Sequence, residues 1–258
     1  LLYHALKAPL PTFGHVPMVL GSDRSRLSKR HGAMSVTAYR DMGFLPDALV
    51  NYLVRLGWSH GDQEFFTRDE LIRVFDLKNI GRSAGVFDPD KLLALNAEHI
   101  RATAPENLVA PLAPFLKDCG IEIQEDDYIC NVIETLAPRS KTLEEMARAA
   151  LFFYLDDIIY EEKAARKFLK AAALSPLKLL SEKLGALTTY NQENLEDVFK
   201  DVMDQTGLKL GKIAQPVRVA LTGKTASPGI FEIIAILGPE RVIPRLEKAI
   251  QYIEGLEG

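Results

Sequence analysis

The sequence predicts a mainly α-helical protein with only short extended segments. From Pro105 onward, apolar residues recur at spacings of three and four, which is the period of an amphipathic helix. Helix-capping residues precede many of these segments, and this part of the sequence lacks the alternating apolar and polar runs that are typical of strands. The chain has 258 residues, 47% of them hydrophobic, so it can form two or three compact domains.

Helix start and stop signals divide residues 1–104 into short helices and loops. Pro46 and Gly57 delimit an amphipathic helix, and Thr67 with Glu70 has the spacing of a capping box. Asp88 precedes a proline and can cap the helix that follows. The predicted elements are an extended piece near His15–Leu20, a short helix capped by Ser35, and helices over Asp47–Leu56, from Thr67, and over Asp90–Arg101.

Residues 105–258 are predicted to be helical almost throughout. Thr142 with Glu145 has capping-box spacing, and Asn191 is a further start signal. Ser175 and Ser227 each precede a proline, which favours the first turn of a helix. The predicted helices contain Leu108–Leu116 and Ile129–Leu136, and then cover Thr142–Tyr154, Ala164–Ala173, Ser175–Leu187, Glu193–Thr206, Leu210–Leu221, Pro228–Leu237 and Pro239–Ile253.

Composition excludes several classes of protein. The longest apolar stretches are shorter than the roughly 20 residues of a membrane span, and the first residues lack the pattern of a signal peptide, so we expect a cytoplasmic protein without membrane contact. Cys119 and Cys130 stand in no metal-binding or disulfide pattern, and no metal site is expected. The net charge of −4 argues against a generally basic nucleic-acid binder.

Charge is nevertheless distributed unevenly along the chain. Residues 205–231 contain no acidic side chain, yet they contain Lys209, Lys212, Arg218 and Lys224. Such a stretch is either an ordinary solvated basic face or a surface that meets phosphate, and the pattern alone leaves both open.

The sequence Arg26-Leu27-Ser28-Lys29-Arg30-His31-Gly32 places several cations in a short loop bounded by glycine. Ser28 can donate hydrogen bonds to phosphate, and Lys29 carries a compact charge on a flexible stem. Arg26 is better suited to planar, bidentate contacts. The loop therefore favours phosphate chemistry.

The order of these residues resembles the KMSKS signature of class I aminoacyl-tRNA synthetases, in the form found in glutamyl-tRNA synthetases. Further segments along nearly the whole chain are similar to the same family. They are Leu20-Gly21-x-Asp23-Arg24, Phe13-x-His15-x-Pro17, Tyr39-Arg40-Asp41-x-Gly43-Phe44-Leu45-Pro46, Leu53-x-x-Leu56-Gly57-Trp58, Phe87-Asp88-x-x-Lys91-Leu92, Gln215-Pro216-x-Arg218 and Ser227-Pro228-Gly229.

The resemblance implies a particular domain organisation. Glutaminyl enzymes and archaeal or eukaryotic glutamyl enzymes have β-barrel anticodon domains, whereas the helical pattern fits the bacterial-type glutamyl enzyme. We expect the end of a catalytic domain with a stem-contact region over 1–104, and two helical anticodon-binding domains over 105–160 and 161–258. The HIGH-type motif and the Rossmann nucleotide-binding half are not in the sequence, so the expectation is a C-terminal fragment that is inactive alone.

The same resemblance implies the activity of the full-length protein: a monomer that attaches L-glutamate to tRNA(Glu) with ATP and Mg²⁺ through a glutamyl-adenylate. The alternative is a non-catalytic helical RNA-binding or scaffold protein derived from a synthetase. The sequence does not decide whether tRNA(Gln) is also charged.

Residue roles follow from the same resemblance. Lys29 stabilises the ATP phosphates as charge develops, with Ser28 and Arg26 beside it in the loop; Arg26 replaces the lysine usual at its position. An arginine in the region of Arg139 contacts the third anticodon base, and a gap of one or two residues would move this role to Lys141. The other expected tRNA contacts are Arg218, Ser227, Pro228 and Ile230 in the anticodon domain and Lys91 and Arg101 in the stem-contact region.

Some of these residues have equally plain structural interpretations. Asn96 is either a stem contact or a buried hydrogen-bonding residue, and Trp58 is expected to be a core anchor. The Ser227-Pro228 turn could be no more than the start of a helix.

Overall fold

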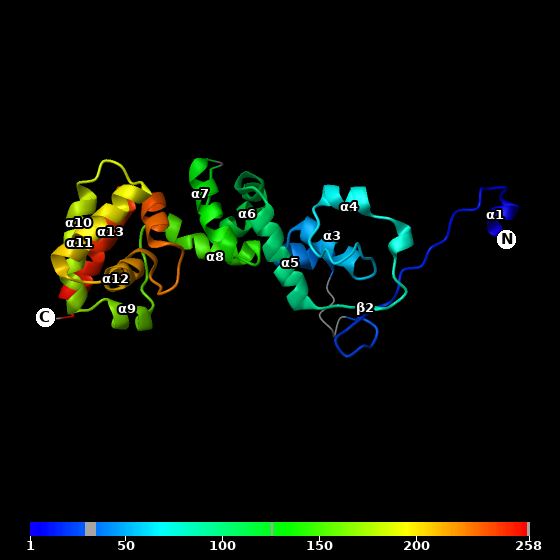
Figure 1. Ribbon diagram of the computed structural model, residues 1–258, viewed down its shortest axis with the longest axis horizontal. Coiled ribbons are helices and arrows are strands. Elements are labelled where there is room, and N and C mark those ends of the chain that lie inside the picture. Colours follow the sequence, from blue (N-terminus) through cyan, green and yellow to red (C-terminus); the bar gives the residue numbers. More distant parts are fainter. Residues whose placement is uncertain (29–34, 125, 257–258) are drawn as a thin grey trace. The chain divides into compact units, whose positions relative to one another are not determined.

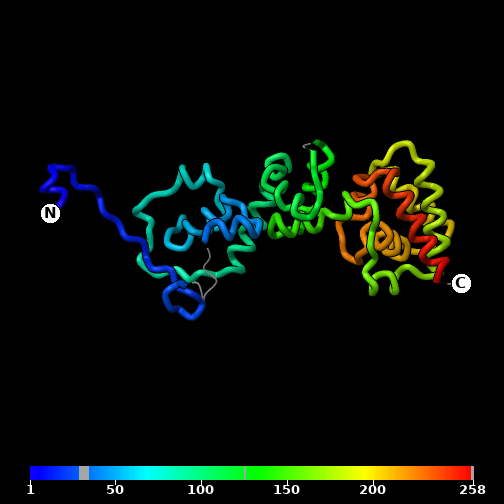
Figure 2. The backbone as a smooth tube through the Cα atoms, turned by 180° about the vertical axis from the view of Figure 1, so that it is seen from behind, coloured from blue at the N-terminus to red at the C-terminus, as the bar shows by residue number. Residues whose placement is uncertain are grey.

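The computed structural model describes residues 1–28, 35–124 and 126–256. The chain forms two compact units, Leu1–Ala102 and Thr103–Gly258 (Figures 1 and 2). Helices make up most of the second unit and are the main secondary structure of the first, and the sheet of the described residues is a single pair of two-residue strands. The predicted mainly α fold is therefore confirmed. No helix in the described ranges is long and apolar enough to cross a membrane.

The first unit contains short helices connected by long loops. β1 and β2 pair in parallel, with Val19 opposite Gly85 and Leu20 opposite Val86. The predicted caps are confirmed: the Ser35 hydroxyl accepts from Ala38 N, and Thr67 and Glu70 form the capping box. The elements are α1 (Leu2–Ala5), β1 (Val19–Leu20), α2 (Val36–Asp41), α3 (Pro46–Arg55), α4 (Arg68–Val74), the 3₁₀ helix η2 (Leu77–Asn79), β2 (Gly85–Val86) and α5 (Pro89–Ala102).

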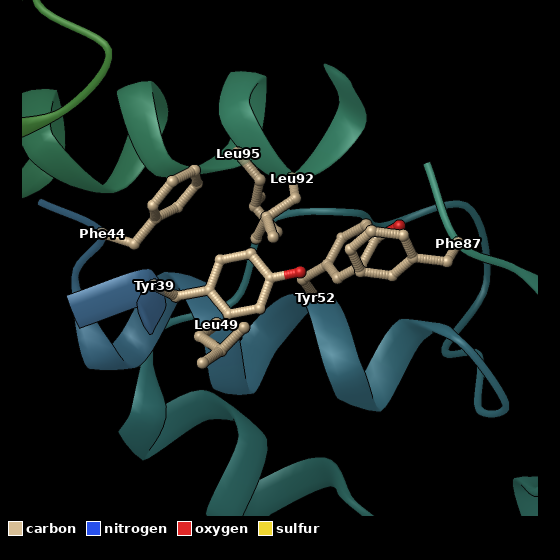
Figure 3. Close-up of a cluster of buried hydrophobic side chains, with 7 residues drawn as sticks. All are labelled: Tyr39, Phe44, Leu49, Tyr52, Phe87, Leu92 and Leu95. Atoms are coloured by element: carbon tan, nitrogen blue, oxygen red, sulfur yellow. The ribbon is translucent and has the colours of Figure 1, made fainter. Parts of the chain in front are cut away.

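The main core of this unit lies where α2, α3 and α5 meet (Figure 3). Tyr52 joins two elements, because its hydroxyl donates to Asp88 O at 2.9 Å and accepts from Asp88 N at 2.6 Å. A second cluster contains Trp58, which is 4% exposed and donates from Nε1 to Asp76 O, as expected for a core anchor. The main cluster consists of Tyr39, Phe44, Leu49, Tyr52, Phe87, Leu92 and Leu95.

The second unit is a helical bundle. Its core contains the apolar faces that the three- and four-residue spacing predicted, including Leu112 on α6, Ile133 on α7 and Leu180 on α10, all fully buried. The elements are α6 (Pro105–Asp118), α7 (Asp127–Leu136), the 3₁₀ helix η3 (Ala137–Arg139), α8 (Leu143–Tyr154), α9 (Glu162–Phe168), α10 (Ala171–Gly185), α11 (Gln192–Thr206), α12 (Leu210–Thr222) and α13 (Ile230–Glu254).

Two predicted helix starts are wrong. Pro176 lies inside α10 and not at its beginning, since the chain breaks earlier, at the extended Lys170 that precedes the helix. A proline this close to the N-terminus removes only a backbone bond near the end of the ladder. The other helix starts at Ile230 rather than Pro228, because the Glu232 carboxylate caps the backbone N–H of Gly229. The predicted break after Leu237 is confirmed by a kink at Gly238 within α13.

Candidate nucleic-acid interface

In the first unit, the core holds the start of the cationic loop. Leu20 and Arg26 form an antiparallel bridge, and Leu27 N donates to Val19 O at 3.0 Å. Leu27 also packs against the main hydrophobic cluster. The Arg26 side chain is exposed and Ser28 is half-buried. Lys29, for which the resemblance implies the phosphate-stabilising role, lies outside the described residues.

The stem-contact candidates lie on α5. Arg101 is exposed, and Lys91 is exposed with its ammonium 2.6 Å from the Glu64 carboxylate. Asn96 is fully buried, and its Oδ1 accepts from Leu45 N at 2.8 Å. The structural interpretation of Asn96 is therefore the one that the geometry supports, whereas Lys91 and Arg101 are accessible to a ligand.

A buried polar group stabilises the region around α5. Asn51 is fully buried, its Oδ1 accepts from Phe66 N at 2.9 Å, and its Nδ2 donates to Glu64 O at 3.0 Å. His99 Nε2 lies 3.1 Å from the same Oδ1. Burial lowers the pKa of His99, so the imidazole is neutral at pH 7.

In the second unit, two predicted anticodon contacts converge on one turn. Arg139, at the end of η3, donates from Nη1 to Ser227 O at 2.7 Å. Arg218, on α12, donates from Nη1 to the Ser227 hydroxyl and to Pro228 O, the latter at 2.5 Å. The fold thus brings together residues that are 88 positions apart in the sequence.

Two guanidinium groups lie close together at this turn. Burial lowers the pKa of Arg218, and the nearby charge of Arg139 lowers it further. Among the described residues, neither arginine forms a salt bridge with a carboxylate. Two guanidinium groups without an acidic partner form a site suited to a base edge or a phosphate.

Arg139 also lines two neighbouring cavities of about 520 Å³ each, a volume in the usual range of ligand sites. The first, the α7–α13 cavity, is lined by Asn131, Glu134, Thr135, Pro138, Arg139, Gln192, Phe231, Glu232, Ala235 and Ile236. The second, the α8–α12 cavity, is lined by Leu136, Arg139, Ser140, Glu145, Arg148, Ala149, Leu151, Phe152, Leu155, Asp157, Ile158, Ile159, Thr222, Lys224, Ala226, Ser227 and Pro228.

The remaining candidates differ in exposure. Lys141 is exposed in the turn between η3 and α8, close in sequence to Arg139. Lys209 and Lys212 are exposed at the start of α12. Ile230 is the first residue of α13 and is 6% exposed, so its side chain belongs mainly to the core.

Sequence reasoning missed several residues that line these cavities. Phe152, on α8, is half-buried and lines the α8–α12 cavity. Ile159 is 91% exposed in the segment between α8 and α9 and lines the same cavity. An exposed isoleucine outside any helix has no sequence signal of its own. Gln192 of the α7–α13 cavity was visible only as the residue after a cap.

Comparison with known proteins shows which families this chain resembles. Residues 107–250, more than half of the chain, match the family described as "Anticodon binding domain", and residues 1–94 match "tRNA synthetases class I (E and Q), catalytic domain". The chain is therefore part of a class I aminoacyl-tRNA synthetase. The chain belongs to the glutamate–tRNA ligase family, because relatives with that name match it along nearly its whole length.

One of these relatives, a glutamate–tRNA ligase of Desulfosudis oleivorans, is 58% identical over 98% of this chain and 54% of its own length. Another, from Syntrophobacter fumaroxidans, is 55% identical over 100% of this chain and 55% of its own length. The chain spans about half the length of the curated relatives it matches.

A solved structure of a glutamate–tRNA ligase from Elizabethkingia meningosepticum has the same fold, with a TM-score of 0.83 at 24% identity, covering 98% of this chain and 54% of that one. A synthetase structure from Elizabethkingia anophelis gives a TM-score of 0.78 at 25% identity, over 97% of this chain and 53% of that one.

Proposed function

We propose that this chain is the tRNA-recognition part of an enzyme that attaches L-glutamate to tRNA(Glu) with ATP, through a glutamyl-adenylate. The observation that carries the proposal is the convergence of Arg139 and Arg218 on the Ser227–Pro228 turn, within the matched anticodon-binding domain. The non-catalytic alternative is not favoured, because residues 1–94 match a catalytic domain.

Base reading is assigned to Arg139. Its exposed guanidinium lines both cavities, so it can present paired donors to the edge of an unstacked base, or stack on its face. Arg218, Ser227 and Pro228 form the turn beside it, and Lys141 is the next candidate if the register is shifted. We assign the third anticodon position to Arg139.

Phosphate contact is assigned to exposed cations elsewhere. Lys209 and Lys212 in the second unit, and Lys91 and Arg101 in the first, are exposed on the surface. Contacts of this kind position the RNA and carry no sequence information. Their contribution to affinity should depend on salt.

Within the same proposal, the loop at Arg26–Ser28 contacts ATP, and Lys29 stabilises the negative charge that develops on the ATP phosphates. In this proposal Mg²⁺ is bound together with ATP, because Mg²⁺ is usually held through substrate phosphates. We also propose three domains, over 1–104, 105–160 and 161–258, in a cytoplasmic monomer, with this chain inactive by itself.

The test is a charging assay of the full-length protein with purified tRNA(Glu), together with glutamate-dependent ATP–pyrophosphate exchange. The expected result is glutamyl-tRNA formation and exchange by the full-length protein. The 258-residue chain should bind tRNA(Glu) with salt-dependent affinity and catalyse no exchange. A full-length protein that binds tRNA but fails in both catalytic assays would support the non-catalytic alternative. The same assay with tRNA(Gln) decides whether the enzyme discriminates between the two.

A further inference from the structure

Arg245, on α13, is an arginine buried in the second unit with no assigned role. It is 3% exposed, and among the described residues it forms no salt bridge with a carboxylate. Its Nη1 donates to Leu221 O at 2.8 Å, and its Nη2 donates to Leu155 O at 2.5 Å. Burial lowers its pKa to about 10, so the guanidinium remains charged at neutral pH.

The two carbonyls mark the ends of two helices. Leu155 is the C-terminal cap of α8, and Leu221 lies in the last turn of α12. Carbonyls at helix C-termini lack partners within the helix, and they carry the negative end of the helix dipole. The single guanidinium of Arg245 therefore donates to a carbonyl at each of two helix C-termini and offsets the negative ends of both helix dipoles.

The segments that leave these two helix ends contact each other directly. Glu161 N donates to Gly223 O at 2.9 Å. Gly223 has a φ of +74°, and a Cβ added there would lie 2.2 Å from Ile159 O, so the two backbones are as close as glycine allows. Lys248, also on α13, pairs with Asp157 at 2.8 Å.

These segments also form the walls of the α8–α12 cavity. Residues 155 and 157–159 line it from one segment, and residues 222, 224 and 226–228 line it from the other. The second segment contains the Ser227–Pro228 turn that Arg139 and Arg218 contact. Arg245 therefore donates to the ends of the two helices, and the segments that follow these ends line the α8–α12 cavity beside the proposed base-reading residue.

We propose that Arg245 is a positioning residue for tRNA recognition: it fixes the 155–161 and 222–228 segments relative to each other, and through them the turn beside Arg139. This inference rests on the proposed function of the second unit. Arg245 does not contact the RNA itself, because its side chain is buried; its effect on binding is transmitted by these two segments.

Loss of the guanidinium should disturb these segments more than the bundle. Val242, Leu246 and Ala249 of the same helix are fully buried, so α13 keeps its apolar packing when Arg245 is replaced by a side chain of similar length. The Leu155 and Leu221 carbonyls would lose a charged donor, and the two segments would be free to separate.

The test compares Arg245→Met with Arg241→Met in the full-length protein. Arg241 is a matched control because it lies one turn earlier on α13, carries the same charge, and has its guanidinium over the ring of Tyr128. Dissociation constants are measured for a tRNA(Glu) transcript and for one changed only at the third anticodon position, over a range of salt concentrations.

Arg245→Met should weaken binding of the matching transcript by about 3- to 30-fold and reduce the preference for the matching base. The dependence of log Kd on log salt should keep its slope, because no phosphate contact is lost. Arg241→Met should change affinity by less than about 2-fold. Hydrogen exchange should become faster for amides of residues 155–161 and 222–228 in Arg245→Met and stay unchanged in Arg241→Met.

Wild-type affinity and preference in Arg245→Met would overturn the inference, as would a salt slope shallower by one charge, which would indicate direct phosphate contact. An equal loss in Arg241→Met would show an effect of net charge alone. If Arg245→Met does not fold, Arg245→Lys, which keeps the charge but cannot present the same planar pair of donors, must show the loss of preference. Failure of the wild-type protein to bind tRNA(Glu) would instead refute the proposed function.

Discussion

Replacing Arg139 by alanine tests the base-reading assignment most directly. The side chain is exposed, and within the described part of the chain its hydrogen bond is the donation to Ser227 O at 2.7 Å. Such a bond contributes about 0.5–1.5 kcal/mol net to the folded protein, so the variant should fold. Loss of this intramolecular hydrogen bond should affect the binding of every tRNA alike, so it does not contribute to the ratio of the dissociation constants of two transcripts.

The magnitude of the specific effect follows from the chemistry of the contact. A well-formed bidentate contact to a base contributes about 1–3 kcal/mol of discrimination. At about 1.4 kcal/mol for each factor of ten, Arg139→Ala should weaken binding of the matching transcript by about 5- to 150-fold. Transcripts changed at the third anticodon position should lose much less, so the preference at that position becomes flat.

Lys209→Ala and Lys212→Ala are the controls for this measurement, since both lysines are exposed at the start of α12. Each should weaken all transcripts alike and make the salt dependence shallower, as expected for a phosphate contact. If Arg139→Ala lowers affinity equally for every anticodon, its base-reading role is refuted, and Lys141 is the next residue to test.

Three further predictions concern chemistry and stability. Lys29→Ala should lower kcat of the full-length enzyme by about 10²–10³ with little effect on tRNA affinity, and Lys29→Arg should rescue it poorly; normal ATP–pyrophosphate exchange would contradict this. Gly207→Ala should lower the free energy of unfolding, measured in urea, by about 1–2 kcal/mol, because Gly207 has a positive φ. Gly223→Ala should lower it further, because Gly223 has a positive φ and also lies against Ile159 O; equal losses would argue against that contact. Because the pKa of His99 is lowered in the folded protein, this imidazole is protonated at a higher pH in the unfolded chain than in the folded one. The free energy of unfolding should therefore fall as pH drops below about 6.5, and it should fall less in His99→Gln; identical pH profiles of the two proteins would be inconsistent with this.

Most helices could be predicted from the sequence because their signals are local. Thr67 and Glu70 are three residues apart and form their capping box without help from the rest of the fold. Asn191 likewise accepts from Asn194 N at 2.9 Å. Pro176 misled the prediction because tertiary packing decides whether a proline near a helix start begins the helix or lies within it. The β1–β2 pair was missed in part, since two-residue strands separated along the chain have no periodic signal.

The candidate site was only partly accessible to sequence reasoning. The resemblance supplied Arg139, Arg218 and Ser227 as separate residues, and only the packed structure shows that the two guanidinium groups contact the same turn. Arg245 carries no motif, and an arginine in a helical segment is normally expected on the surface. Its role depends on where the ends of α8 and α12 come to lie.

The proposed base-reading site therefore depends on packing across the predicted boundary between 105–160 and 161–258. Arg139 reaches across it to Ser227 O, and Arg245 reaches back across it to Leu155 O. Each half supplies groups that the other needs: the first supplies the exposed arginine, and the second supplies the turn and the buried guanidinium behind it. If this interpretation is correct, residues 105–160 expressed alone should show no preference at the third anticodon position even though they contain Arg139, whereas residues 103–258 should retain it.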